Sequence, residues 1–171
     1  MKNLLFLSIV LSTLLFSCKK NPATVISDIT GSFDVTFKGT SHHYTLGYAQ
    51  VDNRGVTAVT GFNSTSATGQ DGTVLIQFKG QTGNYLFGDE NQDNKAALNA
   101  VGFAGASEIY SNTYILCTTG ALINTDGHVT ITSYGPVGGK IEGTFTGAVA
   151  LVRNCTTETA PISGSFSVIR K

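Results

Sequence analysis

Carboxylate and amide side chains fill six consecutive positions in the middle of the chain, and oxygen ligands at this density could bind a cation. Asp89, Asn91 and Asp93 alternate as the first three ligands of a calcium loop do. The pattern is not an EF-hand, because Asn94 replaces the required glycine and Ala100 replaces the bidentate glutamate. We expect either an irregular calcium site or a solvated loop, and no other cofactor.

The remaining chemistry-bearing residue types form no recognisable catalytic set. Adjacent histidines on a strand face opposite ways, so at most one of His42 and His43 could join His128 on a metal ion. No Gly-x-Ser-x-Gly motif of a serine hydrolase occurs, and no spacing singles out a pair of glycosidase carboxylates. We therefore predict no catalytic residue.

Tyrosine is the residue type best suited to a binding surface in this chain. Tyr44 and Tyr48 have the spacing of residues that share one face of a strand, where their rings could stack on a sugar or a peptide. The alternative is that these rings only cover sheet surface, since tyrosine is favoured in strands. The absence of tryptophan weighs against a sugar ligand.

The start of the chain has the layout of an export signal, with one lysine before an apolar run at 4–16. This run is shorter than the roughly 20 apolar residues of a membrane span. Its end, Leu15-Phe16-Ser17-Cys18, resembles the lipobox of bacterial lipoproteins, although Phe16 is larger than the usual residue there. The resemblance implies cleavage before Cys18 and lipidation of its thiol. The alternative is an ordinary signal peptide with a chance cysteine.

Three segments follow from this interpretation. Residues 1–17 are the lipoprotein signal peptide, 18–28 are the lipidated cysteine and a flexible tether, and 29–171 form a single domain. The chain has 11 basic and 11 acidic residues and no basic patch, so we expect no nucleic-acid partner. The expected partners are a membrane, through the lipid anchor, and an unidentified ligand or envelope protein.

Two further cysteines, Cys117 and Cys155, remain once Cys18 carries lipid. An even pair in an oxidising envelope compartment predicts a disulfide. It would close a loop of about 40 residues and stabilise the domain by about 4 kcal/mol. A reactive thiol or a metal site are the alternatives, but a catalytic cysteine needs a nearby base and no motif supplies one.

Alternation of apolar and polar residues is the strongest structural pattern, and it begins at 29–38. The phrase Ile-x-Gly-Ser/Thr-Phe occurs at 29–33, 141–145 and 162–166, where glycine would allow close approach of strands and phenylalanine would fill the core. Further strands are expected at 44–51, 56–62, 73–78, 84–87, 112–122 and 128–134, and one short helix at 96–106. About nine or ten short strands predict an all-β fold, an antiparallel sandwich or barrel.

The phrases at 82–88, 127–132, 141–147 and 162–166 occur in an order that resembles a family of uncharacterised Bacteroidota lipoproteins with a C-terminal β-rich module. The resemblance covers about residues 80–170 and rests on core and turn residues. It implies the β fold and an envelope location. It implies no catalytic residue.

We therefore expect a lipoprotein held at a bacterial envelope membrane, in particular the outer membrane, with the leaflet left open. The expected role is non-catalytic binding of a ligand on loops or on one face of a sheet. A structural partner of another envelope protein is the first alternative, and a hydrolase is the second.

Overall fold

All secondary structure in the described part of the chain is β-strand. The structure is a computed structural model, and it describes residues 30–62, 72–103, 108–116, 118–152 and 158–171. These residues form thirteen strands, of which eleven belong to one large sheet and two to a separate hairpin. No helix long and apolar enough to cross a membrane occurs among them.

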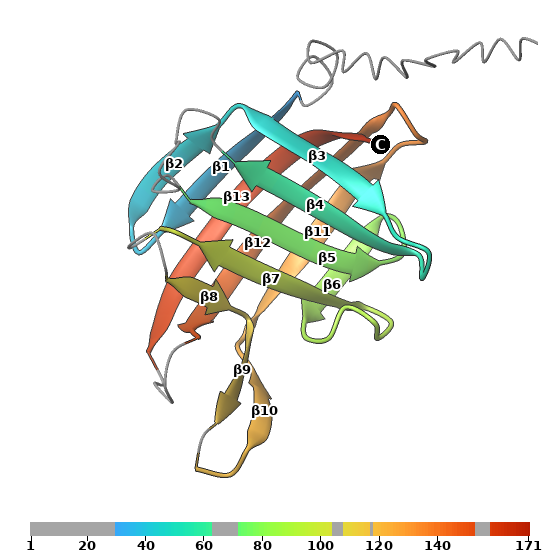
Figure 1. The fold of residues 1–171 in the computed structure, drawn as a ribbon. Coiled ribbons are helices and arrows are strands. Elements are labelled where there is room, and N and C mark those ends of the chain that lie inside the picture. The colour runs from blue at the N-terminus through green and yellow to red at the C-terminus, as the bar shows by residue number, and fades with distance from the viewer. Residues whose placement is uncertain (1–29, 63–71, 104–107, 117, 153–157) are drawn as a thin grey trace, which may run out of the picture.

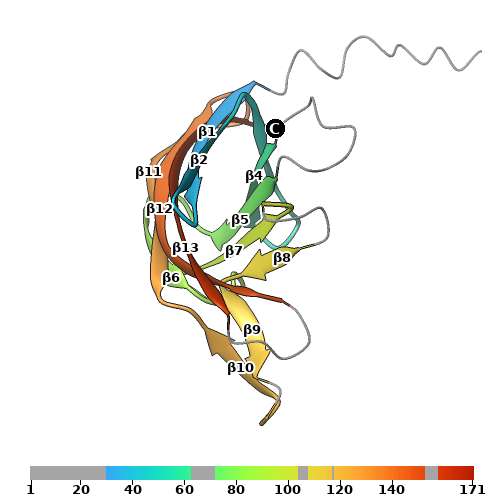
Figure 2. The ribbon, with the colours of Figure 1, turned by 90° about the vertical axis from the view of Figure 1, so that its left-hand side faces the viewer.

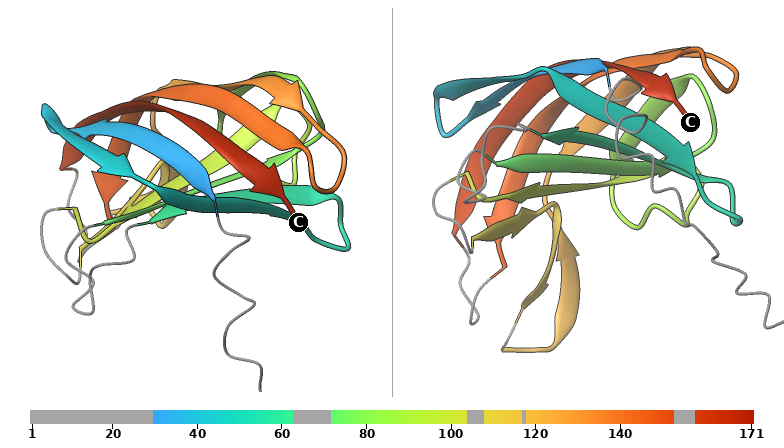
Figure 3. Two further views of the ribbon diagram at one scale, coloured as in Figure 1. Left: turned by 90° about the horizontal axis from the view of Figure 1, so that it is seen from above. Right: turned by 45° about the horizontal axis from the view of Figure 1, so that its top comes forward.

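The large sheet folds into two layers whose strands cross one another (Figure 1, Figure 3). The front sheet contains β3 (Leu46–Val51), β4 (Val56–Phe62), β5 (Thr73–Lys79), β7 (Lys95–Val101) and β8 (Ile109–Ser111). The back sheet contains β1 (Gly31–Phe37), β2 (Thr40–Tyr44), β6 (Gly83–Phe87), β11 (Gly127–Tyr134), β12 (Lys140–Leu151) and β13 (Thr159–Arg170).

Short pairings join the two layers at both sides. The end of β13 pairs in parallel with β3, and β6 pairs in parallel with β7. The other strand pairs are antiparallel, including a contact of β8 with β12. Strand pairing therefore continues around a closed ring, and the predicted sandwich or barrel is a flattened barrel made of two crossed layers.

Side chains fill the space between the layers. The core includes Phe33 of β1, Ile76 of β5 and Leu98 of β7, all fully buried. Each of these strands alternates buried and partly exposed residues, as a wall with one dry face requires. The interior is thus a packed core.

The repeated Ile-x-Gly-Ser/Thr-Phe phrase builds the centre of the back sheet. Phe145 of β12 lies opposite Gly164 of β13, and Phe166 lies opposite Gly143. A Cβ atom at Gly164 would lie 2.5 Å from the Phe145 ring, and one at Gly143 would lie 2.8 Å from the Phe166 ring. Each ring therefore occupies the space that its partner glycine leaves, which confirms the predicted roles of both residue types.

Most of the predicted strands are confirmed, and three expectations need correction. The helix predicted at 96–106 is wrong, because 95–101 form β7, with Ala96, Leu98 and Ala100 buried. The single strand predicted at 112–122 is wrong, because the chain turns back there. An additional strand, β2, ends at Tyr44, because Lys38 and Gly39 adopt positive φ and reverse the chain after β1; the strand expected at 44–51 therefore begins only at Leu46.

The separate hairpin consists of β9 (Thr113–Leu116) and β10 (Ala121–Asn124) and projects beyond the barrel (Figure 1, Figure 2). It lies at one end of the molecule. The start of β1 and the C-terminus lie at the other end, where Lys171 donates its backbone N–H to Ala49. The hairpin is thus directed away from the end at which the chain enters the barrel.

Candidate functional site

A hollow of about 240 Å³ opens on the outer surface of the front sheet, beside the base of the hairpin. Five segments line it: β5, β7, the loop after β6, the chain that leads from β8 into β9, and β10 of the hairpin. The lining residues are Gln77, Gly88, Asp89, Glu90, Ala97, Asn99, Ser111, Asn112, Thr113 and Leu122.

The strand pattern of the front sheet turns two amide side chains into this hollow. Gln77 and Asn99 occupy the outward positions between buried neighbours on β5 and β7. Gln77 lies opposite Ala97 in the β5–β7 register, and Asn99 lies opposite Ser111 in the β7–β8 register. The small Ala97 side chain leaves the space that makes this part of the surface concave.

Asn112 fixes the hairpin to the edge of β7. Its side-chain oxygen accepts the backbone N–H of Leu98 at 2.7 Å, and its amide nitrogen donates to the carbonyl of Ala96 at 3.2 Å. Its own backbone N–H donates to the carbonyl of Leu98. The fully buried Asn112 therefore bonds to β7 as a residue of a neighbouring strand would. It does so between the β7 residues that pair with β6 and those that pair with β8.

Local hydrogen bonds shape the loop that contributes the carboxylates. Asp89 accepts hydrogen bonds from the backbone and side-chain N–H groups of Asn91, and these lower the pKa of Asp89 below its ordinary value. Asn91 in turn accepts a hydrogen bond from Arg54 at 3.1 Å. Asp89 is therefore an anion at neutral pH, held at the rim of the hollow.

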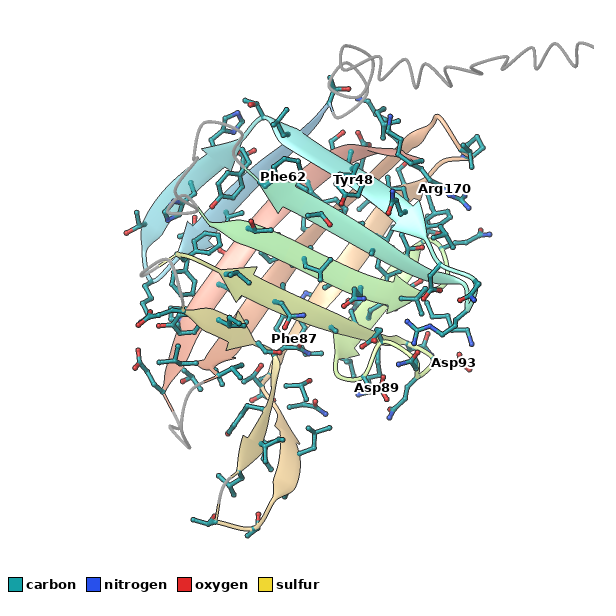
Figure 4. All side chains as sticks on the ribbon, viewed as in Figure 1. Tyr48, Phe62, Phe87, Asp89, Asp93 and Arg170 are labelled. Atoms are coloured by element: carbon teal, nitrogen blue, oxygen red, sulfur yellow. The ribbon has the colours of Figure 1, made fainter. Side chains whose placement is uncertain are left out.

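The three residues of the predicted calcium site have different surroundings. Only Asp89 lines the hollow, while Asn91 contacts the guanidinium of Arg54, and Asp93 lies farther along the loop (Figure 4). Within the described ranges, no three His, Cys, Asp or Glu side chains lie close enough together to hold one metal ion. The observed contacts are those of a solvated loop.

The expectation that Tyr44 and Tyr48 share a strand face is wrong. Tyr44 ends β2 and is 2% exposed in the core, whereas Tyr48 lies on β3 on the outer surface of the front sheet. A bend between the two strands reverses the alternation. Tyr48 packs edge-on against Phe62, with ring centroids 6.3 Å apart, so only Tyr48 of the pair lies on a surface (Figure 4).

A second hollow, of about 330 Å³, lies on the outer face of β1, β2 and β13. There His43 Nδ1 lies 2.7 Å from a carboxylate oxygen of Asp34, and both side chains are more than half exposed. Asp34 lies between His43 and Ser165 in the strand registers. In a Ser-His-Asp triad the histidine lies between the serine and the aspartate. Here the aspartate lies in the middle, so the three residues lack that arrangement.

All three cysteines lie outside the described residues. Lipidation of Cys18 and a disulfide between Cys117 and Cys155 therefore stay predictions.

Several lining residues were not found from the sequence. Gln77 and Asn99 look like ordinary outward strand residues, and their meeting depends on the β5–β7 and β7–β8 pairings. Asn112 carried one usable signal, because an asparagine between Ser111 and Thr113 can bond nearby backbone groups and favours a break in the strand. Leu122 was placed at the end of one predicted strand, 112–122, so its pairing with Ile115 was not expected.

The chemistry of the hollow suits a ligand that donates hydrogen bonds or carries positive charge. Asp89 and Glu90 supply carboxylates, and Gln77 and Asn99 supply amides that both donate and accept. Leu122 supplies an apolar wall. No lysine or arginine is among the described residues that line the hollow.

Comparison with known proteins adds no relative to this description. No protein-family model, no curated protein and no solved structure matches the chain.

Proposed function

We propose that the protein is a lipid-anchored, non-catalytic binding module of a bacterial envelope, and that its ligand binds in the hollow beside the hairpin. The convergence of polar groups from four separate segments next to an exposed leucine carries this proposal. Binding sites typically combine an apolar wall with a few convergent polar groups.

The filled core supports an external site. Large side chains such as Phe78, Phe145 and Tyr110 occupy the interior, so the barrel leaves the outer surface and the loops for a ligand. The acid–base pair of Asp34 and His43 lies on the other layer, away from this hollow. Because this histidine is remote, the carboxylates of the hollow have a binding role in this proposal.

Ligand-dependent thermal stability tests the binding role. The melting temperature of the purified chain is measured with calcium, zinc, a chelator, and panels of glycans and peptides. A ligand at 100 times its Kd adds about 2.7 kcal/mol and raises the midpoint by several degrees. A flat response to every compound would contradict the proposal.

Two matched variants locate the site. Asn99→Ala removes an amide from the hollow and should abolish the thermal shift. Gln50→Ala removes an exposed amide from β3, outside the hollow, and should leave the shift intact. Equal shifts in both variants would place the ligand elsewhere.

The anchor is tested on the full chain in a bacterial host. The unaltered protein should incorporate labelled palmitate and sediment with membranes, because two or three acyl chains hold a protein firmly at a bilayer. Cys18→Ser should lose the label and move to the soluble fraction. Retention of the label in this variant would contradict lipidation at Cys18.

A further inference from the structure

The hairpin extends the hollow into a longer surface. Ile115 and Leu122 lie opposite each other in the β9–β10 register and are 62% and 63% exposed. Thr113 is two residues from Ile115 and shares its face of β9, and both Thr113 and Leu122 line the hollow. We call the hollow together with Thr113, Ile115 and Leu122 the docking surface.

Strand pairing among the described residues does not account for the exposed apolar side chains of the hairpin. A two-stranded hairpin alone is marginally stable in water, and edge strands are usually protected by charged residues. Here residues 109–125 contain no charged residue, although the chain carries 22 in total. In the part of the chain that the structure describes, β9 and β10 pair only with each other.

Charge distinguishes the possible occupants of this surface. Asp89 and Glu90 line the hollow of the docking surface, and no basic side chain is among the described residues that line it. An anionic bilayer would be repelled by these carboxylates. A second copy related by twofold symmetry would bring the same carboxylates together. An occupant with basic side chains is complementary.

We infer that the docking surface binds an extended polypeptide segment of another protein in which apolar and basic side chains alternate. The inference rests on the proposed function and names its ligand class. Alternate side chains of an extended segment point to opposite sides, so one set can contact Ile115 and Leu122 while the other reaches Asp89 and Glu90. The amides of the hollow can bond the backbone of the segment.

Binding of two synthetic peptides tests this inference. Fluorescence anisotropy is measured on the purified chain with a labelled ten-residue peptide of alternating valine and lysine, and with the matched peptide of valine and glutamate. We expect saturable binding of the lysine peptide, at least tenfold tighter than that of the glutamate peptide. Added salt should weaken it, because the charges lie near the surface.

Three variants separate the docking surface from general attraction between acidic and basic groups. Leu122→Ser should weaken binding of the lysine peptide tenfold or more. Val137→Ser removes an exposed valine from the loop between β11 and β12, outside the docking surface, and should have no effect. Glu90→Gln should reduce the ratio of the affinity for the lysine peptide to the affinity for the glutamate peptide.

Four results would overturn the inference. They are the absence of peptide binding, equal affinity for both peptides, unchanged binding by Leu122→Ser, and an alternative occupant. One alternative occupant is a second copy of the chain, seen as a dimer in sedimentation velocity. The other is a membrane, seen as binding to vesicles of phosphatidylethanolamine and phosphatidylglycerol. Either result counts only if Leu122→Ser abolishes it.

The thermal screen separates failure of the inference from failure of the proposed function. If the peptides do not bind but another compound gives a shift that Asn99→Ala removes, only the ligand class is wrong. If no compound and no peptide binds, both the inference and the proposed function are wrong.

Discussion

Apolar residues have opposite roles in two regions of the molecule. One region is the centre of the back sheet, formed by β1, β12 and β13 and called the wall below, and the other is the β9–β10 hairpin. In the wall, Phe145 and Phe166 each fill the space above a glycine of the neighbouring strand, and both are buried. In the hairpin, Ile115 and Leu122 pair across two strands and remain exposed. Packing explains the residue types of the first region and leaves those of the second unexplained.

This difference separates residues that stabilise the fold from residues available to a partner. A wall residue contributes through the buried area and the cavity that its loss would leave. A residue exposed on a two-stranded hairpin contributes little to folding. Substitutions in the two regions should therefore have separable effects on stability and on binding.

The largest effect is expected in the wall. Phe145→Ala removes a ring that is 2% exposed and leaves a cavity above Gly164. The expected loss is about 3–5 kcal/mol in the free energy of unfolding, measured by urea denaturation. Leu122→Ala is the matched change in the hairpin. A similar loss for both variants would remove the distinction between the regions.

A smaller effect is expected at the joint between the two regions. Asn112→Ala leaves the buried N–H of Leu98 without the acceptor described above, and this should cost about 1–3 kcal/mol. Hydrogen exchange of the β9 and β10 amides should also become faster, because the hairpin loses its attachment to β7. Asn84→Ala, at an exposed amide of β6, is the control. Unchanged exchange in Asn112→Ala would show that another contact holds the hairpin.

The sequence predicted the wall well and the joint poorly, for a physical reason. Apolar and polar residues alternate along 31–37 and 140–146 and within the phrase at 162–166, so the burial of Val35, Ile141 and Phe166 follows from local periodicity. Strand β7 was mistaken for a helix because its three alanines favour helices on their own, and pairing with β5 overrode that preference. Local propensity alone could not have predicted this outcome.

The candidate site depends on contacts between distant segments, and the sequence could supply only parts of it. Asp89 was identified from the density of carboxylates, but its neighbours in the hollow come from β5, β7 and the hairpin. Tyr44 was assigned to the surface because the bend before β3 has no clear sequence signal. The hollow therefore became visible only with the strand order.

A pH-dependent effect, smaller than the first two, is expected at the β3–β4 turn. Asp52 accepts backbone N–H groups from Val56 and Arg54, and these contacts lower the pKa of Asp52 below its ordinary value of 3.8. The stabilisation is complete above that value and is lost as the pH falls below it. Asp52→Asn should therefore lower the melting temperature slightly at pH 7.

The same comparison is then made in acid. The difference between Asp52→Asn and the unaltered protein should shrink as the pH falls below the ordinary carboxyl pKa of 3.8, because the native carboxylate becomes protonated in more acid solution. Asp93→Asn, in another exposed loop, is the control. A difference that stays constant with pH would contradict the role of the Asp52 charge.

The smallest effect on stability is expected in the hairpin itself. Leu122→Ser should change the free energy of unfolding by no more than about 0.5 kcal/mol, because the side chain is already 63% exposed. Urea denaturation measures this change on the same preparation used for peptide binding. A loss above 2 kcal/mol would show that Leu122 belongs to the core of the fold.

The pairing of the first strand with the last has a consequence for biosynthesis. Gly31 lies opposite Val168, and β13 is also the strand that joins β12 to β3. The barrel therefore cannot close until almost the whole chain has been synthesised, and its contacts of long sequence separation predict slow folding. Every intermediate formed during translation therefore lacks the β1–β13 and β13–β3 pairings, and the last strand completes the ring.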